Sequence, residues 1–278
     1  MRISEIISRT VNELKQAGIQ NPVLDAELLV SQPLAVDRMR LHVDADRELT
    51  SAEVGRIRRL VGRRLRFEPI AYILGKKEFY SLEFQVNRDV LIPRPETELV
   101  VDLVIYYARP GARIADIGTG SGAIAVSVKH SRPDLEVHAT DISAKAVSVA
   151  RRNASAILGK NKIKFHQGDL FEPLAGSRFQ VIAVNPPYID RERSGSLQQD
   201  LSYEPEAALF SDGEGGAVIG KIIRDAGDYL YPGGMLLMEI GDTMNDFVQK
   251  SGERGGFTVS VLNDYAGLPR VAIMKSTA

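Results

Sequence analysis

The chain has 278 residues, of which 44% are hydrophobic and 26% charged, with a formal net charge of -1, so neither disorder over most of its length nor a globally basic nucleic-acid binder is expected. The chain has no cysteine, which excludes disulfides, thiolate metal sites and cysteine nucleophiles. Its four histidines form no H-x-x-x-H pair, so we expect no metal. No apolar run approaches the ~20 residues of a membrane span, and the first residues do not resemble a signal peptide, so we expect a soluble, cytoplasmic protein without membrane association.

Residues 1–75 predict a small helical domain. Apolar residues at helical spacing indicate a first helix, Pro22 stands at the start of a second, and Thr50-x-x-Glu53 is a capping box that opens a third. Six arginines and no acid lie between residues 56 and 66. This stretch fits a contact surface for an acidic partner protein or RNA and, equally, a solvated helix face.

Residues 76–95 predict a β-hairpin and a proline-bounded loop that link this domain to residues 96–278. From residue 96 onward, helical and strand patterns alternate. This alternation predicts an α/β domain with a mostly parallel sheet that is covered by helices on both faces. Residues 189–215 predict a long loop that directly follows Tyr188, and two interpretations stay open: a lid that gates the substrate, or a disordered surface insertion.

A glycine-rich loop stands where the first predicted strand of this domain turns into a helix, with the sequence Asp116-Ile117-Gly118-Thr119-Gly120-Ser121-Gly122. Such a loop lets a ligand approach the backbone, and Asp141, at the end of the next strand, is placed to bind ribose hydroxyls. The spacing also satisfies a loose dinucleotide fingerprint, so the loop alone leaves NAD and other adenosine cofactors open. Asp116 suits the ammonium of an amino-acid-bearing cofactor better than an anionic pyrophosphate.

The tetrapeptide Asn185-Pro186-Pro187-Tyr188 follows a later predicted strand. Ligands of open parallel sheets bind beyond the carboxyl ends of the strands, so we expect this motif in the same crevice as the glycine loop. The Asn185 side-chain oxygen and the Pro186 carbonyl can each accept one N–H of a planar amino group, and the Tyr188 ring offers a stacking surface. The motif therefore predicts a site that holds a planar –NH2 group and stabilises, by electrostatics, the positive charge that develops when its nitrogen attacks.

The string D-x-G-x-G-x-G resembles the first motif of class I S-adenosylmethionine (SAM) methyltransferases, and Asn-Pro-Pro-Tyr resembles the motif of amino-methyltransferases. Further motifs resemble the HemK/PrmC protein-glutamine methyltransferases: residues 68–75 (EPIAYILG), 92–98 (IPRPETE), 168–171 (GDLF), 204–209 (EPxxAL), 239–241 (EIG) and 264–270 (DYAGxxR).

This resemblance implies a class I fold with a seven-stranded sheet and methylation by SAM, with S-adenosylhomocysteine (SAH) as product. The acceptor would be the side-chain amide nitrogen (N5) of the glutamine in the Gly-Gly-Gln loop of bacterial class I release factors. Residues 1–75 would recognise the substrate. The residues from Gly118 to Gly122, with Thr119, Gly120 and Ser121 between them, would line SAM. Asp169 and Leu170 would flank its adenine.

The resemblance also assigns Asn185 to both cofactor and substrate, and Pro186, Pro187 and Tyr188 to the glutamine pocket. One alternative is a DNA or rRNA amino-methyltransferase, which uses the same chemistry but must flip a base. The near-zero net charge disfavours it, and no direct contact with nucleic acid is expected. A binding protein without chemistry is the other alternative, and the complete tetrapeptide disfavours it.

Overall fold

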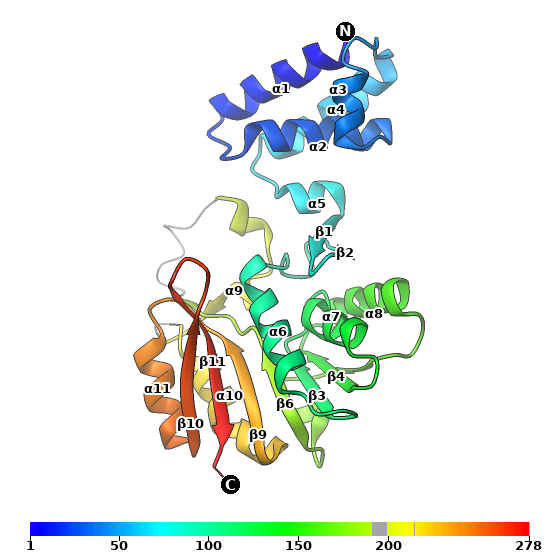
Figure 1. The fold of residues 1–278 in the computed structure, drawn as a ribbon. Helices are drawn as coiled ribbons and strands as arrows, with labels where there is room; N and C mark the ends of the chain where they lie inside the picture. The colour runs from blue at the N-terminus through cyan, green and yellow to red at the C-terminus, as the bar shows by residue number, and fades with distance from the viewer. Residues whose placement is uncertain (191–198, 214, 278) are drawn as a thin grey trace. The chain divides into compact units, whose positions relative to one another are not determined.

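The computed structural model describes residues 1–190, 199–213 and 215–277. The chain falls into two compact units (Figure 1). The first contains Met1–Gly75 together with residues 199–203, and the second contains the rest of the described chain from Lys76 onward. The boundary after Gly75 lies where the predicted hairpin begins.

The first unit is helical. It contains α1 (Ile3–Gln16), α2 (Pro22–Leu34), α3 (Arg38–Val43), α4 (Ser51–Arg64) and α5 (Ile70–Leu74). Their apolar faces meet in one core, whose buried members include Ile6, Leu14, Leu29, Leu41 and Ile57.

Local signals explain where two of these helices begin. The Thr50 hydroxyl accepts from the Glu53 backbone N–H, and the Glu53 carboxylate accepts from the Thr50 N–H, so the predicted capping box is formed. Pro22 is the first residue of α2. The sequence did not reveal α3 and α5, because helices of six and five residues are too short to show a clear apolar period.

The second unit opens with the predicted hairpin. Strand β1 (Lys76–Phe79) pairs antiparallel with β2 (Leu82–Gln85). Phe79 and Phe84 are buried in the core of this unit. The hairpin is therefore part of this unit's hydrophobic packing and not only a connection.

The central sheet has seven strands, as the resemblance implied. Their order is β10 (Phe257–Asn263), β11 (Pro269–Ser276), β9 (Leu230–Glu239), β6 (Phe179–Val184), β3 (Arg113–Ile117), β4 (Glu136–Asp141) and β5 (Lys164–Gln167). The five strands from β9 to β5 are parallel, while β11 pairs antiparallel with β9 and with β10. The chain runs from β3 outward to β5 and then returns to β6 on the other side of β3. Such a reversal creates a crevice at the carboxyl ends of β3 and β6.

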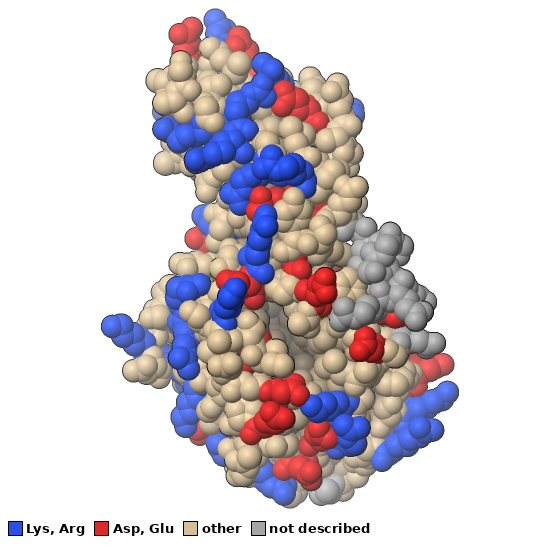
Figure 2. Space-filling view, turned by 180° about the vertical axis from the view of Figure 1, so that it is seen from behind, with Lys and Arg blue, Asp and Glu red and all other residues tan. Residues whose placement is uncertain are grey.

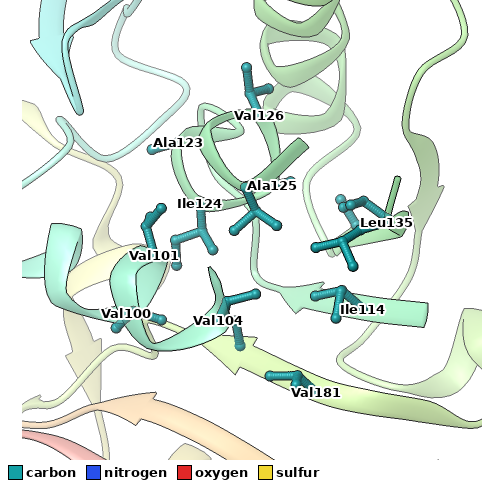
Figure 3. Packing of buried hydrophobic residues seen from close by; sticks show 14 of the residues in the cluster. Val100, Val101, Val104, Ile114, Ala123, Ile124, Ala125, Val126, Leu135 and Val181 are labelled. Carbon is teal, nitrogen blue, oxygen red and sulfur yellow. The ribbon is translucent and has the colours of Figure 1, made fainter. Parts of the chain in front are cut away.

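Helices cover both faces of the sheet (Figure 1). On one face lie α6 (Glu98–Tyr107), α7 (Ala123–Ser131) and α8 (Ala144–Leu158). Figure 3 shows part of this core, where valines of α6 and the start of α7 pack on Ile114 and Val181 of the sheet. On the other face lie α10 (Ala217–Ala226) and α11 (Asn245–Arg254). Successive strand residues alternate between the two cores, as Ile114 and Ala115 do, which is why these strands are almost entirely apolar.

The segment from 189 to 215 was predicted to be a long loop, and this prediction was wrong for most of its described part. It contains β7 (Ile189–Asp190), a 3-10 helix (Gln199–Tyr203), α9 (Glu206–Leu209) and β8 (Phe210–Ser211). Strand β7 pairs parallel with β8. Residues 191–198 and 214 lie outside the described chain. These elements could not be predicted from the sequence, because each has five residues or fewer and is too short to show a clear apolar period.

Candidate active site

The register of the parallel strands brings the predicted site residues to one edge of the sheet. Ile117 aligns with Thr140 and with Val184, and Val184 aligns with Met238. The next residue along each of these four strands is Gly118, Asp141, Asn185 and Glu239. The glycine loop and the Asn-Pro-Pro-Tyr motif therefore begin side by side on adjacent strands. Glu239 joins the same row, although the sequence had not marked it as a site residue.

The glycine loop adopts a conformation that L side chains rarely adopt. Gly118, Gly120 and Gly122 all have positive φ, at 71°, 55° and 85°. A Cβ atom at Gly122 would lie 3.2 Å from the Cβ of Ala150 in α8, whereas a Cβ at Gly118 or Gly120 would meet nothing within 4 Å. Gly122 is thus needed for packing, while the first two glycines leave open space beside the backbone, where a ligand can approach.

Asp116 lies beneath this loop and is 1% exposed. Its Oδ2 accepts from the Thr119 hydroxyl at 2.6 Å and from the Ala125 backbone N–H at 3.1 Å. Its Oδ1 is buried without a hydrogen-bond partner among the described residues. Burial raises the pKa of Asp116 to about 7. One oxygen therefore ties the loop to the start of α7, and the other is left for a donor from outside.

Asp141 connects the glycine loop to the next strand. Its Oδ2 accepts from the Gly120 backbone N–H at 2.9 Å, and its Oδ1 accepts from the Ser143 N–H at 2.9 Å. Burial raises the pKa of this carboxyl. The following residue, Ile142, is 62% exposed. The Asp141 carboxylate can accept hydrogen bonds from sugar hydroxyls, and the exposed Ile142 side chain offers an apolar surface for a planar ring.

Asp169 and Leu170 follow β5. Leu170 has a positive φ of 45°, and its carbonyl accepts from the Thr140 hydroxyl at 3.0 Å, which holds this turn against β4. Asp169 Oδ2 accepts from Lys221 Nζ of α10 at 2.5 Å. Lys221 is a partner that the sequence did not suggest.

Asn185 and Tyr188 are held by a buried acid. The Asn185 Nδ2 donates to the Thr97 hydroxyl at 3.1 Å, and that hydroxyl donates to Glu239 Oε2 at 2.6 Å. The Tyr188 hydroxyl donates to Glu239 Oε1 at 3.3 Å. Glu239 is 1% exposed, and burial raises its pKa to about 7. Burial also raises the pKa of Tyr188, so its phenol is neutral over the physiological range.

Thr97 and Glu239 stand in two segments that carried the resemblance, residues 92–98 and 239–241, but no role had been assigned to them. An ion pair joins the first of these segments, residues 92–98, to residues 204–209, which also carried the resemblance. Arg94 Nη2 lies 2.5 Å from Glu204 Oε1, and Glu204 Oε2 accepts from the Ile92 N–H at 2.9 Å. This pair fixes the loop that carries Thr97.

Known proteins of two domain families and of the same fold resemble this chain. Residues 5–75 match the PrmC N-terminal domain and residues 97–221 match the methyltransferase small domain. A release factor glutamine methyltransferase of Geobacter sulfurreducens is 38% identical over 92% of this chain and 89% of its own length. That of Neisseria gonorrhoeae is 40% identical over 91% of this chain and 93% of its own. A methyltransferase of Pyrococcus furiosus shares the fold, with a TM-score of 0.55 and 20% identity over 78% of this chain and 97% of its own.

The sheet order and the loop at its edge define a class I SAM-dependent methyltransferase. Within this class, the chain belongs to the release factor glutamine methyltransferase family. The predicted fold, family and cofactor are confirmed.

The residues present fit SAM. The open space beside Gly118 and Gly120 admits a ligand, and the unpartnered Oδ1 of Asp116 can accept from an ammonium. Asp141 and Ile142 can receive the ribose and the adenine. Among the described residues, no group of three or more His, Asp or Glu side chains could hold a metal ion. No helix within the described chain is long and apolar enough to cross a membrane.

The arginine-rich stretch of the first unit is partly neutralised by ion pairs. Arg58 pairs with Glu13 at 2.9 Å, Arg63 with Glu68 at 2.8 Å, and the buried Arg64 with Asp25 at 2.7 Å and Asp200 at 3.0 Å. The other three arginines, Arg56, Arg59 and Arg66, are exposed and have no ion pair with a described residue. Figure 2 accordingly shows acidic as well as basic side chains over this unit.

Proposed function

We propose that this enzyme transfers a methyl group from SAM to the side-chain amide nitrogen of the glutamine in the Gly-Gly-Gln loop of bacterial class I release factors, in the cytoplasm. The observation that carries the proposal is the strand register, which sets Asn185 beside Gly118 and within one row of Asp141. Family membership supplies the acceptor, since the relatives are named release factor glutamine methyltransferases.

The cofactor, when bound, supplies an electrophilic methyl group on a sulfonium. Asp116 Oδ1 would hold the ammonium, Asp141 the ribose, and Asp169 and Leu170 the adenine edge, while Thr119 and Ser121 shape the loop. Lys221 would limit the freedom of Asp169, because the two side chains are paired.

Asn185, Pro186 and Tyr188 would carry the catalysis. An amide nitrogen is a poor nucleophile because its lone pair is delocalised into the carbonyl. Asn185 Oδ1 and the Pro186 carbonyl would each accept one N–H, which turns the lone pair toward the methyl group and stabilises the positive charge that develops on nitrogen. Pro187 stiffens the loop, and Tyr188 closes the pocket around the glutamine side chain.

The first unit would bind the body of the release factor through the exposed arginines near α4. The experiment that tests the proposed function is methylation of a purified release factor, followed by mass spectrometry of the peptide that carries the Gly-Gly-Gln loop. A methyl group on that glutamine supports the proposal. Methyl transfer to DNA or rRNA in place of the factor would contradict it.

A further inference from the structure

A buried chain of hydrogen bonds runs from Asn185 to Glu239 through Thr97. Thr97 is 4% exposed and lies in a 3-10 helix (Pro95–Thr97), Asn185 follows β6, and Glu239 ends β9. Three segments that are distant in sequence thus meet at the residue that would hold the substrate amide.

The number of donors in this chain fixes its direction. A threonine hydroxyl has one hydrogen and can therefore donate only one hydrogen bond. Because the Thr97 hydroxyl donates to Glu239 at 2.6 Å, its oxygen can only accept from Asn185. The Asn185 Nδ2 must therefore face Thr97, which leaves Oδ1 on the other branch of the side-chain amide. If the Asn185 amide had the opposite orientation, its Nδ2 would point an N–H at the substrate amide nitrogen. That nitrogen is a poor acceptor because its lone pair is delocalised into the carbonyl.

The two carboxylate oxygens of Glu239 accept hydrogen bonds that hold the first and the last residue of the tetrapeptide. Oε2 accepts from Thr97, which holds Asn185, and Oε1 accepts from the Tyr188 hydroxyl. The charged groups that act on Glu239 are the Arg270 guanidinium, which favours the ionised carboxylate, and Glu96, which opposes it. Arg270 lies in β11, which pairs with β9.

We propose that Thr97 and Glu239 are positioning residues that lock the Asn185 amide with Oδ1 toward the acceptor nitrogen. This inference rests on the proposed glutamine methylation. It concerns the turnover step and not the binding of SAM, because neither side chain is among those that fit the cofactor.

The test uses the full-length enzyme with release factor, and compares Thr97→Val with Thr97→Ser. Valine keeps the shape and removes the hydroxyl, whereas serine keeps the hydroxyl. We expect Thr97→Val to lower kcat about tenfold or more, since the amide loses the partner that sets its orientation, while Thr97→Ser restores most of the rate. The KM for release factor and the Kd for SAH should stay within about twofold in both variants. A kcat for Thr97→Val close to that of the wild type would overturn the inference.

A double-mutant cycle with Asn185→Ala shows whether Thr97 acts through Asn185. In the Asn185→Ala background, Thr97→Val should cost little further activity. A full additional loss there would mean that Thr97 acts by another route, and would also overturn the inference.

Glu239→Gln gives an independent test if Thr97→Val does not fold. A glutamine replaces one of the two carboxylate oxygens with an NH2 donor, so Thr97 or Tyr188 would face a donor in place of an acceptor. The kcat should therefore fall while SAH affinity holds. An unchanged kcat would refute the positioning role. Failure of the wild-type enzyme to methylate the factor would instead refute the proposed function.

Discussion

Asn153 of α8 and Gln85 of β2 exchange two hydrogen bonds across 68 positions of the chain. The Asn153 Oδ1 accepts from the Gln85 N–H at 2.8 Å, and its Nδ2 donates to the Gln85 carbonyl at 3.0 Å and to the Ser121 carbonyl at 2.8 Å. One buried amide therefore ties the hairpin to the glycine loop.

Replacing Asn153 with leucine should lower the free energy of unfolding by about 3 kcal/mol, because three backbone groups lose their partner. Thermal or denaturant unfolding measures this effect. Arg152→Ala, at the exposed neighbouring position on the same helix, is the control and should change stability by about 0.5 kcal/mol or less. Equal losses of unfolding free energy in the two variants would show that the Asn153 hydrogen bonds do not stabilise the fold.

Gly122 and Gly118 should respond differently to alanine. Both have positive φ, which costs a non-glycine residue about 1–2 kcal/mol. At Gly122 the new Cβ would also press on Ala150 and Val126, so its total cost should reach about 2–4 kcal/mol. At Gly118 the Cβ would enter the open space proposed for SAM. Gly118→Ala should therefore weaken SAH binding and lower the free energy of unfolding less than Gly122→Ala does. Calorimetric SAH binding and thermal unfolding, measured on both variants, separate the two effects.

SAM affinity should depend on pH through Asp116. Its raised pKa, about 7, means that the carboxyl is largely protonated below that pH, whereas the ammonium of SAM needs it ionised. Protonation therefore competes with binding, and affinity should fall about fivefold from about pH 7 to about pH 6. Asp116→Asn should bind more weakly and lose this dependence, while Asp228→Asn, at an exposed acid, should retain it. A pH-independent wild-type Kd would contradict the assignment of the ammonium to Asp116.

The exposed arginines of α4 should affect the protein substrate and not the cofactor. Charge reversal at Arg56 and Arg59 should raise the KM for release factor several-fold and leave the Kd for SAH unchanged. Reversal at Lys250 and Arg254 of α11 makes the same change in net charge in the other unit and is the matched control. If both pairs raise KM equally, only net charge matters, and α4 is not a contact surface.

Local patterns were sufficient to predict that the glycine loop joins a strand to a helix and that strands and helices alternate after residue 96. Gly118, Gly120 and Gly122 follow a strand directly, and Asp141 ends the next strand, so their proximity could be inferred from the order of the elements. The tetrapeptide could be placed in the same way.

The support of Asn185 could not be predicted from local patterns. Thr97 and Glu239 are 142 positions apart, and Glu239 lies in the same row as Asn185 only because of the register of β6 with β9. The arginine-rich stretch shows the same limit. Its charge is reduced by Glu13 and Asp25, which lie in other helices and are not visible in the stretch itself.

The proposed acceptor is the glutamine in the Gly-Gly-Gln loop of a release factor. The most direct measurement is transfer of label from SAM to purified release factor, run beside the same factor with Gln→Ala in its Gly-Gly-Gln loop. The enzyme should label the wild-type factor alone, and Asn185→Ala should lower that label far more than it lowers the affinity for SAH. Equal labelling of both factors would place the methyl group on another residue. Transfer to DNA or rRNA, with no label on either factor, would contradict the proposed function.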